Sequence, residues 1–188
     1  MLKSLFRLRG GFIPAALLVV AASLTPAPTL AQTPDRSTDV YQGWILNCAV
    51  QRPNAPEGEK PRDTGARPVC EIVQTFRNRS NNQVIATIAI GRVDPKSERK
   101  IVVQAPIGVW LPDGVIVAAE KASVTARFVR CTPQMCIAEA DARKELLDAL
   151  RNGTATAIEF SDASRSKARL SLSSKGFADA LSALEKRN

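Results

Sequence analysis

The sequence has 188 residues, 45% of them hydrophobic, and a formal net charge of +8, and it contains no histidine. This length is enough for one domain with a substantial core. The lack of histidine excludes the commonest metal ligand and every catalytic pair built on an imidazole. The basic excess indicates either attraction to acidic surfaces or good solubility alone.

Residues 1–31 have the pattern of a secretory signal peptide. Lys3, Arg7 and Arg9 give a positive start, residues 12–24 are apolar, and residues 29–31 (Thr-Leu-Ala) resemble a cleavage site. The apolar stretch is too short for a membrane-spanning helix, and no later run is apolar enough to cross a membrane. We therefore expect a cleaved signal, a mature chain without a transmembrane segment, and a location in the periplasm or outside the cell.

Four cysteines, an even number, predict two disulfides in an exported chain. Of the three possible pairings we favour Cys48–Cys70 and Cys131–Cys136, because each pair encloses turn-prone sequence. The gaps between the cysteines fit no common zinc pattern. A catalytic redox pair would have two residues between its cysteines rather than four. We therefore expect structural cross-links, with no metal and no cofactor.

The first half of the chain predicts strands separated by polar segments. Residues 32–38 are expected to form a flexible leader to a single domain over residues 39–188. Residues 39–50 predict one strand, in which Trp44, Leu46 and Cys48 share a face. Residues 51–68 are rich in proline and predict an exposed loop, which is either a place to meet a partner or a tolerated insertion. Beyond it we expect a hairpin over residues 69–77 and 82–92 and a strand over 99–105.

Residues 105–114 contain two prolines and two glycines among large apolar side chains. Ile107, Val109, Trp110 and Leu111 are the apolar members. We favour a buried loop that crosses between strands, and the alternative is a partly exposed apolar rim that binds something. Strands are expected over 115–119 and 124–131, on either side of a short turn.

The last part of the chain predicts a helix over residues 142–151, capped by Asp141, a strand over 154–160 and a final helix over 176–186. Between the last two, Arg165, Lys167 and Arg169 alternate with uncharged residues, which predicts three positive charges on one strand face. Such a row is usually solvated. If it binds a partner, that partner is a polyanion and the binding weakens with salt.

The other sequence motifs give little support for a catalytic or binding site. Ser164 and Lys167 have the Ser-x-x-Lys spacing of acyl-transfer enzymes, but that chemistry needs the pair on a helix, so we interpret the match as coincidence. No phosphate loop, calcium loop or nucleic-acid motif is present in the sequence. We expect no catalytic residue and no nucleic-acid partner, and the oligomeric state stays open.

The elements together predict a mainly β protein. We count eight or nine strands and two short helices, a pattern typical of an antiparallel β-sandwich or a partly closed barrel.

The order of several short motifs resembles the invasion-associated locus B family of exported Gram-negative bacterial proteins, over most of the chain from Tyr41 to Leu184. The motifs are Gly43-Trp44 with Cys48, then Cys70-Glu71-Ile72-Val73-Gln74, then Ala105-Pro106-Ile107-Gly108 with Leu111-Pro112-Asp113-Gly114, then Arg130-Cys131-Thr132-Pro133 with Cys136-Ile137-Ala138-Glu139, and Lys175-Gly176-Phe177. The resemblance implies an exported, non-enzymatic, β-rich protein, linked in some members to invasion of host cells. It implies no catalytic residue. The segment 51–68 departs from the family, since it is long and rich in proline.

Overall fold

The structure is a computed structural model that describes residues 36–50, 68–92, 97–120, 122–153 and 155–187. The predicted signal peptide, the first part of the predicted leader and all but the last residue of the proline-rich segment 51–68 lie outside the described residues.

The described residues form strands with two α-helices and one 3₁₀ turn. The strands are β1 (Arg36–Tyr41), β2 (Trp44–Val50), β3 (Pro68–Arg77), β4 (Val84–Gly91), β5 (Lys100–Pro106), β6 (Val115–Ala119), β7 (Ala122–Cys131), β8 (Met135–Asp141), β9 (Thr156–Ser161) and β10 (Lys167–Ser171). The helices are α1 (Lys144–Asn152) and α2 (Phe177–Arg187), and the 3₁₀ turn is η1 (Leu111–Asp113).

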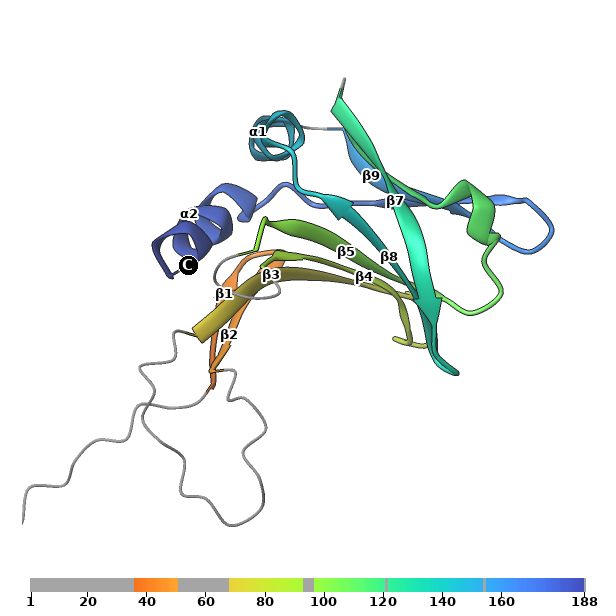
Figure 1. Ribbon diagram of the computed structural model, residues 1–188, viewed down its shortest axis with the longest axis horizontal. Coiled ribbons are helices and arrows are strands. Elements are labelled where there is room, and N and C mark those ends of the chain that lie inside the picture. The colour runs from red at the N-terminus through yellow and green to blue at the C-terminus, as the bar shows by residue number, and fades with distance from the viewer. Residues whose placement is uncertain (1–35, 51–67, 93–96, 121, 154, 188) are drawn as a thin grey trace, which may run out of the picture. The chain divides into compact units, whose positions relative to one another are not determined.

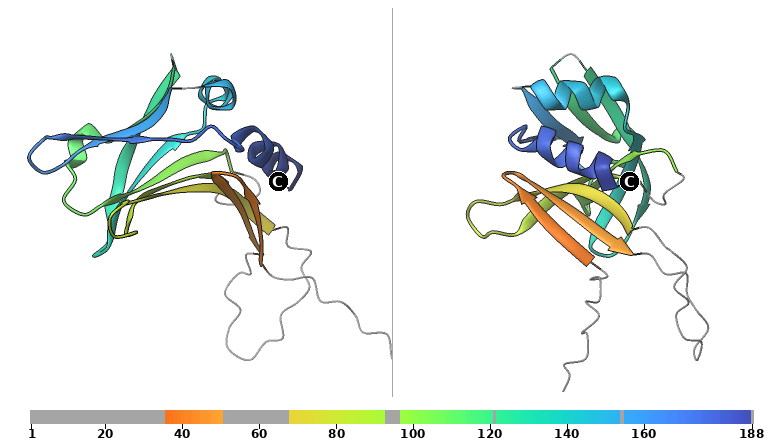
Figure 2. Two further views of the ribbon diagram at one scale, coloured as in Figure 1. Left: turned by 180° about the vertical axis from the view of Figure 1, so that it is seen from behind. Right: turned by 90° about the vertical axis from the view of Figure 1, so that its left-hand side faces the viewer.

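All ten strands belong to one antiparallel sheet in the order β1-β2-β3-β4-β5-β8-β7-β6-β9-β10. The sheet curls, so that β9 lies across from β4 and β5, and both helices lie at its open side (Figures 1 and 2). This is the partly closed barrel, one of the two arrangements that the sequence predicts, and not a pair of stacked sheets. The mainly β class and the two short helices are confirmed.

The N-terminal strand pair differs from the prediction of a single strand over residues 39–50. The chain turns at Gln42 and Gly43, where Gln42 has φ 51°, and the two halves pair from Arg36↔Ala49 to Tyr41↔Trp44. A two-residue turn of this kind needs left-handed backbone, which glutamine seldom adopts, so its sequence gave a weak signal. Because β1 begins at Arg36, the last three residues of the predicted leader belong to the sheet, and the β domain begins before the predicted residue 39.

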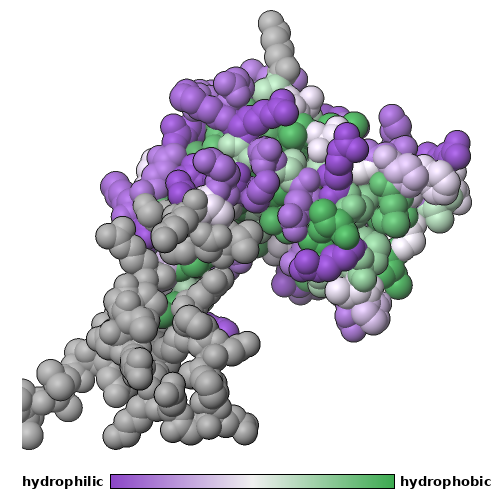
Figure 3. All heavy atoms as spheres, viewed as in Figure 1, coloured by the Kyte–Doolittle hydropathy of each residue, from purple (hydrophilic) through white to green (hydrophobic). Residues whose placement is uncertain are grey.

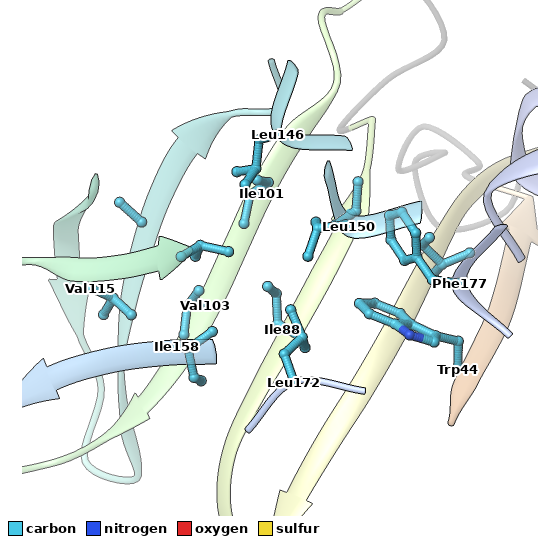
Figure 4. Packing of buried hydrophobic residues seen from close by; sticks show 14 of the residues in the cluster. Trp44, Ile88, Ile101, Val103, Val115, Leu146, Leu150, Ile158, Leu172 and Phe177 are labelled. Atoms are coloured by element: carbon cyan, nitrogen blue, oxygen red, sulfur yellow. The ribbon is translucent and has the colours of Figure 1, made fainter. Parts of the chain in front are cut away.

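The core fills the concave face of the sheet. The buried side chains of β2 are Trp44, Leu46 and Cys48, as the period-two rule predicts. Trp44 packs edge-on against Phe177 of α2, with ring centroids 4.9 Å apart. Figure 4 shows this pair beside Leu150 of α1 and near Ile88 of β4. The two helices therefore close the concave face with their apolar sides.

The residues after β10 are attached to β2 and β3 by hydrogen bonds. The Trp44 indole N–H donates to the Ser173 carbonyl at 2.7 Å. The Gln74 side chain, 7% exposed, donates to the Gly43 carbonyl at 2.9 Å and accepts the Ser173 N–H at 2.7 Å. The Gln74 side chain thereby joins backbone groups from two segments that are distant in the sequence.

Replacing Gln74 with leucine is expected to lower the free energy of unfolding by about 1–2 kcal/mol, because the Ser173 N–H loses its acceptor in a partly buried position. Urea unfolding measures the change. Gln104→Leu, on the outer face of β5, is the matched control and should change the value by less than about 0.5 kcal/mol. Equal effects from the two variants would contradict the bridging role of Gln74.

Both predicted disulfides are present, and no described cysteine is free. Cys48–Cys70 joins paired residues of β2 and β3. Cys131–Cys136 closes the turn between β7 and β8, again between paired residues. Each bridge therefore fixes the register of a neighbouring strand pair.

Asp141 does not cap a helix. It ends β8 and accepts a hydrogen bond from the Lys100 ammonium at 2.5 Å, across the β5–β8 pair. The N-cap of α1 is Arg143, which makes no side-chain capping bond. The hydrogen bond and the charge of Lys100 lower the pKa of Asp141 from its ordinary value.

The Lys100→Gln variant is expected to raise the pKa of Asp141 toward its ordinary value, because the two largest causes that lower it, the hydrogen bond and the charge of Lys100, disappear while the smaller effect of Arg143 remains. A carboxyl group whose pKa is lower in the folded than in the unfolded protein stabilises the fold at pH values above the unfolded-state pKa, and this stabilisation is lost as the pH falls through the folded-state pKa. The free energies of unfolding of the variant and the wild type should therefore differ least in strong acid. Carboxyl NMR titration measures the pKa. In the control Lys144→Gln the pKa of Asp148 should rise instead, since Lys144 lowers it in the same way. An unchanged Asp141 pKa in Lys100→Gln would contradict this ion pair.

Candidate interaction surface

Because the helices and the core fill the concave face, the functional surface must be sought on the outside of the sheet and at its ends. A hollow of about 550 Å³ is lined by outer-face residues of β1 to β5, among them Asn47, Glu71, Ala89 and Lys100. Burial raises the pKa of Glu71 there. A second hollow, of about 300 Å³, lies beside η1 and β9 and is lined by Asp113, Ile116, Glu159 and Lys167 among others.

Two loops meet at the end of the sheet near this second hollow. The first joins β5 to β6 and contains η1, and the second is the turn between β9 and β10. Two backbone hydrogen bonds hold them together, from the Trp110 N–H to the Ser161 carbonyl and from the Ala163 N–H to the Gly108 carbonyl, both at 2.8 Å, and they make Val109 and Asp162 an antiparallel β-bridge. The Ser161 hydroxyl also donates to Asp113 at 2.8 Å. The loops therefore form one ordered unit.

Several apolar side chains of this unit point outward. Ile107 is 59% exposed and Leu111 is 47% exposed, whereas Val109 between them is buried. Ile116 at the start of β6 is 38% exposed. Figure 3, in the same view as Figure 1, shows hydrophobic surface interspersed with polar surface in the region of η1. The loop between β5 and β6 does connect two strands that are not neighbours in the sheet, as we expected. It is not buried throughout, however, and the exposed side chains of Ile107 and Leu111 fit the alternative of a partly exposed apolar rim.

The three basic residues predicted on one strand face are placed differently. Only Lys167 and Arg169 lie on β10, where both are exposed. Arg165 precedes the strand in left-handed backbone, with φ 64°, and its guanidinium lies 4.7 Å from the centre of the Trp110 ring. The prediction of three charges on one strand face is therefore wrong, because the chain is still turning at Arg165.

Some charged side chains at this end of the sheet already have partners within the protein. Arg169 forms an ion pair with Glu159. Asp162 accepts the backbone N–H groups of Ser164 and Ser166 at 2.8 and 2.9 Å. Unlike Arg169, Lys167 and Arg165 form no ion pair with any residue that the structure describes.

We name this surface the loop tip and define it as Ile107, Trp110, Leu111, Arg165 and Lys167. Sequence reasoning named each of these residues, but no sequence signal paired Arg165 with Trp110, because they lie in different loops.

Three further observations concern other kinds of site. Ser164 lies in a turn and Lys167 in a strand, so the Ser-x-x-Lys spacing does not fall on a helix. Within the described ranges, no group of three or more histidine, cysteine, aspartate or glutamate side chains could hold a metal ion. None of the helices in that part of the chain has the length and apolar character needed to cross a membrane.

Comparisons with known proteins identify the family. The model of the invasion associated locus B (IalB) protein family matches residues 44–185. The crystal structure of invasion associated protein B from Bartonella henselae is similar, with a TM-score of 0.61 and 21% sequence identity over 80% of this chain and 95% of that chain. At this identity the likeness shows a shared fold. A search of curated proteins gives no match. Since the family model covers well over half of the chain, including strands β2 to β10, both disulfides and the loop tip, the chain belongs to the invasion associated locus B family.

Proposed function

We propose that the chain is an exported, disulfide-bonded and non-enzymatic binding module of the bacterial envelope, which acts in the periplasm or outside the cell. Two observations support export: every cysteine is in a disulfide, and the chain has a signal-like start. Disulfides of this structural kind persist in oxidising compartments and are rare in the cytosol.

The observation that carries the binding role is the contrast between the two sides of the sheet. The concave side is filled by the helices, with Trp44 and Phe177 both fully buried. At the loop tip, large apolar side chains are exposed on a unit that hydrogen bonds hold in shape. Exposed apolar side chains that gather in one place mark interaction sites. Family membership supports contact with the envelope or with a host surface as the setting.

Export is tested by fractionating cells and alkylating thiols before and after reduction. We expect processed chain in the periplasm or the medium, with its four cysteines alkylated only after reduction. Unprocessed chain in the cytoplasm with four reactive thiols would contradict the proposal.

Binding is tested with a photo-crosslinking residue placed at Leu111 in living cells. We expect crosslinks from this position and none from the control position Ala178, an exposed residue on α2. Equal crosslinking from both positions would contradict the role of the loop tip.

A second candidate function is binding of a polyanion or a small ligand, which the 300 Å³ hollow beside Lys167 favours. Because Glu159 already pairs with Arg169, retention on heparin or lipopolysaccharide should depend on Arg165 and Lys167 and hardly on Arg169. Charge reversal at each of the three, followed by salt elution, tests this. If none of the three charge reversals changes the salt concentration at which the protein elutes, binding of a polyanion through these residues is excluded.

A further inference from the structure

We infer that the loop tip docks on a phospholipid bilayer surface, inserting Ile107 and Leu111 below the headgroups with Arg165 and Lys167 at headgroup level. This inference rests on the proposed binding role and names the partner of the same surface.

The shape of the loop tip favours a lipid layer over a protein. In Figures 1 and 2 the β9–β10 hairpin and η1 extend from one end of the sheet. A stable protein–protein interface takes roughly 20–30 residues on each side. The loop tip offers a few projecting side chains, and a deformable lipid layer can surround such a small projection on all sides.

The residue types also match a membrane interface. Tryptophan, lysine and arginine gather at the headgroup level of bilayers, because each has an apolar body and a polar end. Trp110 is half-buried and carries the Arg165 guanidinium over its ring, at 4.7 Å from the centroid. Lys167 is exposed on the neighbouring strand. Ile107 and Leu111, 59% and 47% exposed, supply the inserting part.

The balance of charge predicts which contribution dominates. Arg169 pairs with Glu159, and the carboxylates of Asp113 and Asp162 belong to the same end of the sheet as Arg165 and Lys167 without forming ion pairs with them, so the formal charges of these six residues sum to zero. Insertion of apolar side chains should therefore contribute more than attraction to anionic lipid. With only two inserting side chains, the binding should be reversible.

Vesicle binding tests the inference on the disulfide-bonded chain as it is isolated after export. The probes are vesicles of phosphatidylcholine alone and of phosphatidylethanolamine with phosphatidylglycerol, each with and without brominated acyl chains. We expect the wild type to sediment with both kinds of vesicle. Brominated chains should quench the emission of Trp110 but not that of Trp44, which is 0% exposed.

Variants assign the binding to residues. Ile107→Ser with Leu111→Ser should lower the partition coefficient about thirtyfold on both kinds of vesicle. Arg165→Gln with Lys167→Gln should lower it about tenfold on anionic vesicles and leave it unchanged on phosphatidylcholine. The matched controls are Val40→Ser, an aliphatic side chain that is 70% exposed on β1, and Arg143→Gln with Lys175→Gln. Equal urea midpoints confirm that all variants fold.

Two outcomes would overturn the inference. One is a vesicle experiment in which the wild type stays in solution with both kinds of vesicle, or in which the loop-tip variants and the control variants lose binding equally. The other is a Leu111 crosslink to a protein instead of lipid. The second result leaves the proposed binding role intact, whereas an absence of any crosslink from Leu111 would count against both.

Discussion

Replacing Trp44 with alanine is expected to lower the free energy of unfolding by about 4 kcal/mol. The indole is 0% exposed, packs against Phe177 and donates to the Ser173 carbonyl. Alanine leaves a cavity between the sheet and α2 and removes the shorter of the two hydrogen bonds that the Ser173 carbonyl accepts, since the other comes from the Gln74 side chain at 3.3 Å. Urea unfolding followed by circular dichroism measures the loss.

A second variant separates packing from hydrogen bonding if the alanine variant does not fold. Trp44→Phe keeps most of the packing but cannot donate, so we expect a loss of about 1–2 kcal/mol. Val84→Ala is the control, because Val84 is 53% exposed, and it should change stability by less than about 0.5 kcal/mol. A loss below 1 kcal/mol in Trp44→Ala would contradict the packing of α2 on this indole.

Removing the Cys48–Cys70 bridge by a double alanine substitution should cost about 3 kcal/mol, against about 2 kcal/mol for Cys131–Cys136, by the loop-entropy estimate. The difference follows from the sequence separations of 22 and 5 residues, since a longer closed loop restricts the unfolded chain more.

Equilibrium unfolding of the two double variants, beside the oxidised wild type, measures both costs. Fully reduced wild type should lose about the sum, because the bridges lie on different strand pairs. If removal of Cys131–Cys136, which closes the shorter loop, costs more stability than removal of Cys48–Cys70, the bridges stabilise the protein through the folded state and not by restricting the unfolded chain.

Local patterns predicted much of this fold. Alternation placed Trp44, Leu46 and Cys48 on one buried face, and the even number of cysteines in turn-prone segments gave both bridges. The hairpin of β3 and β4 followed from two β-branched runs around a polar turn. These features depend on neighbours in sequence, which is why sequence reasoning reached them.

Other features depend on segments that meet only in the folded chain. The side chain of Gln74 gave no sign that it joins the Gly43 turn to Ser173. Arg165 follows the pattern of a strand residue but lies in a turn over Trp110, because the pairing of the two loops sets where β10 begins. Asp141 looked like a helix cap and is an ion-pair partner in β8. In each case tertiary contact overrode a local preference.

The bond from Trp44 to Ser173 spans 129 residues, and it has a consequence for biogenesis. During synthesis or translocation from the N-terminus, the apolar floor of the barrel stays uncovered until α2 is available. Topologies with such distant contacts fold slowly and are prone to aggregate on the way. The nascent protein should therefore need a holdase chaperone, and a chain that stops before Phe177 should be a substrate for quality-control proteases.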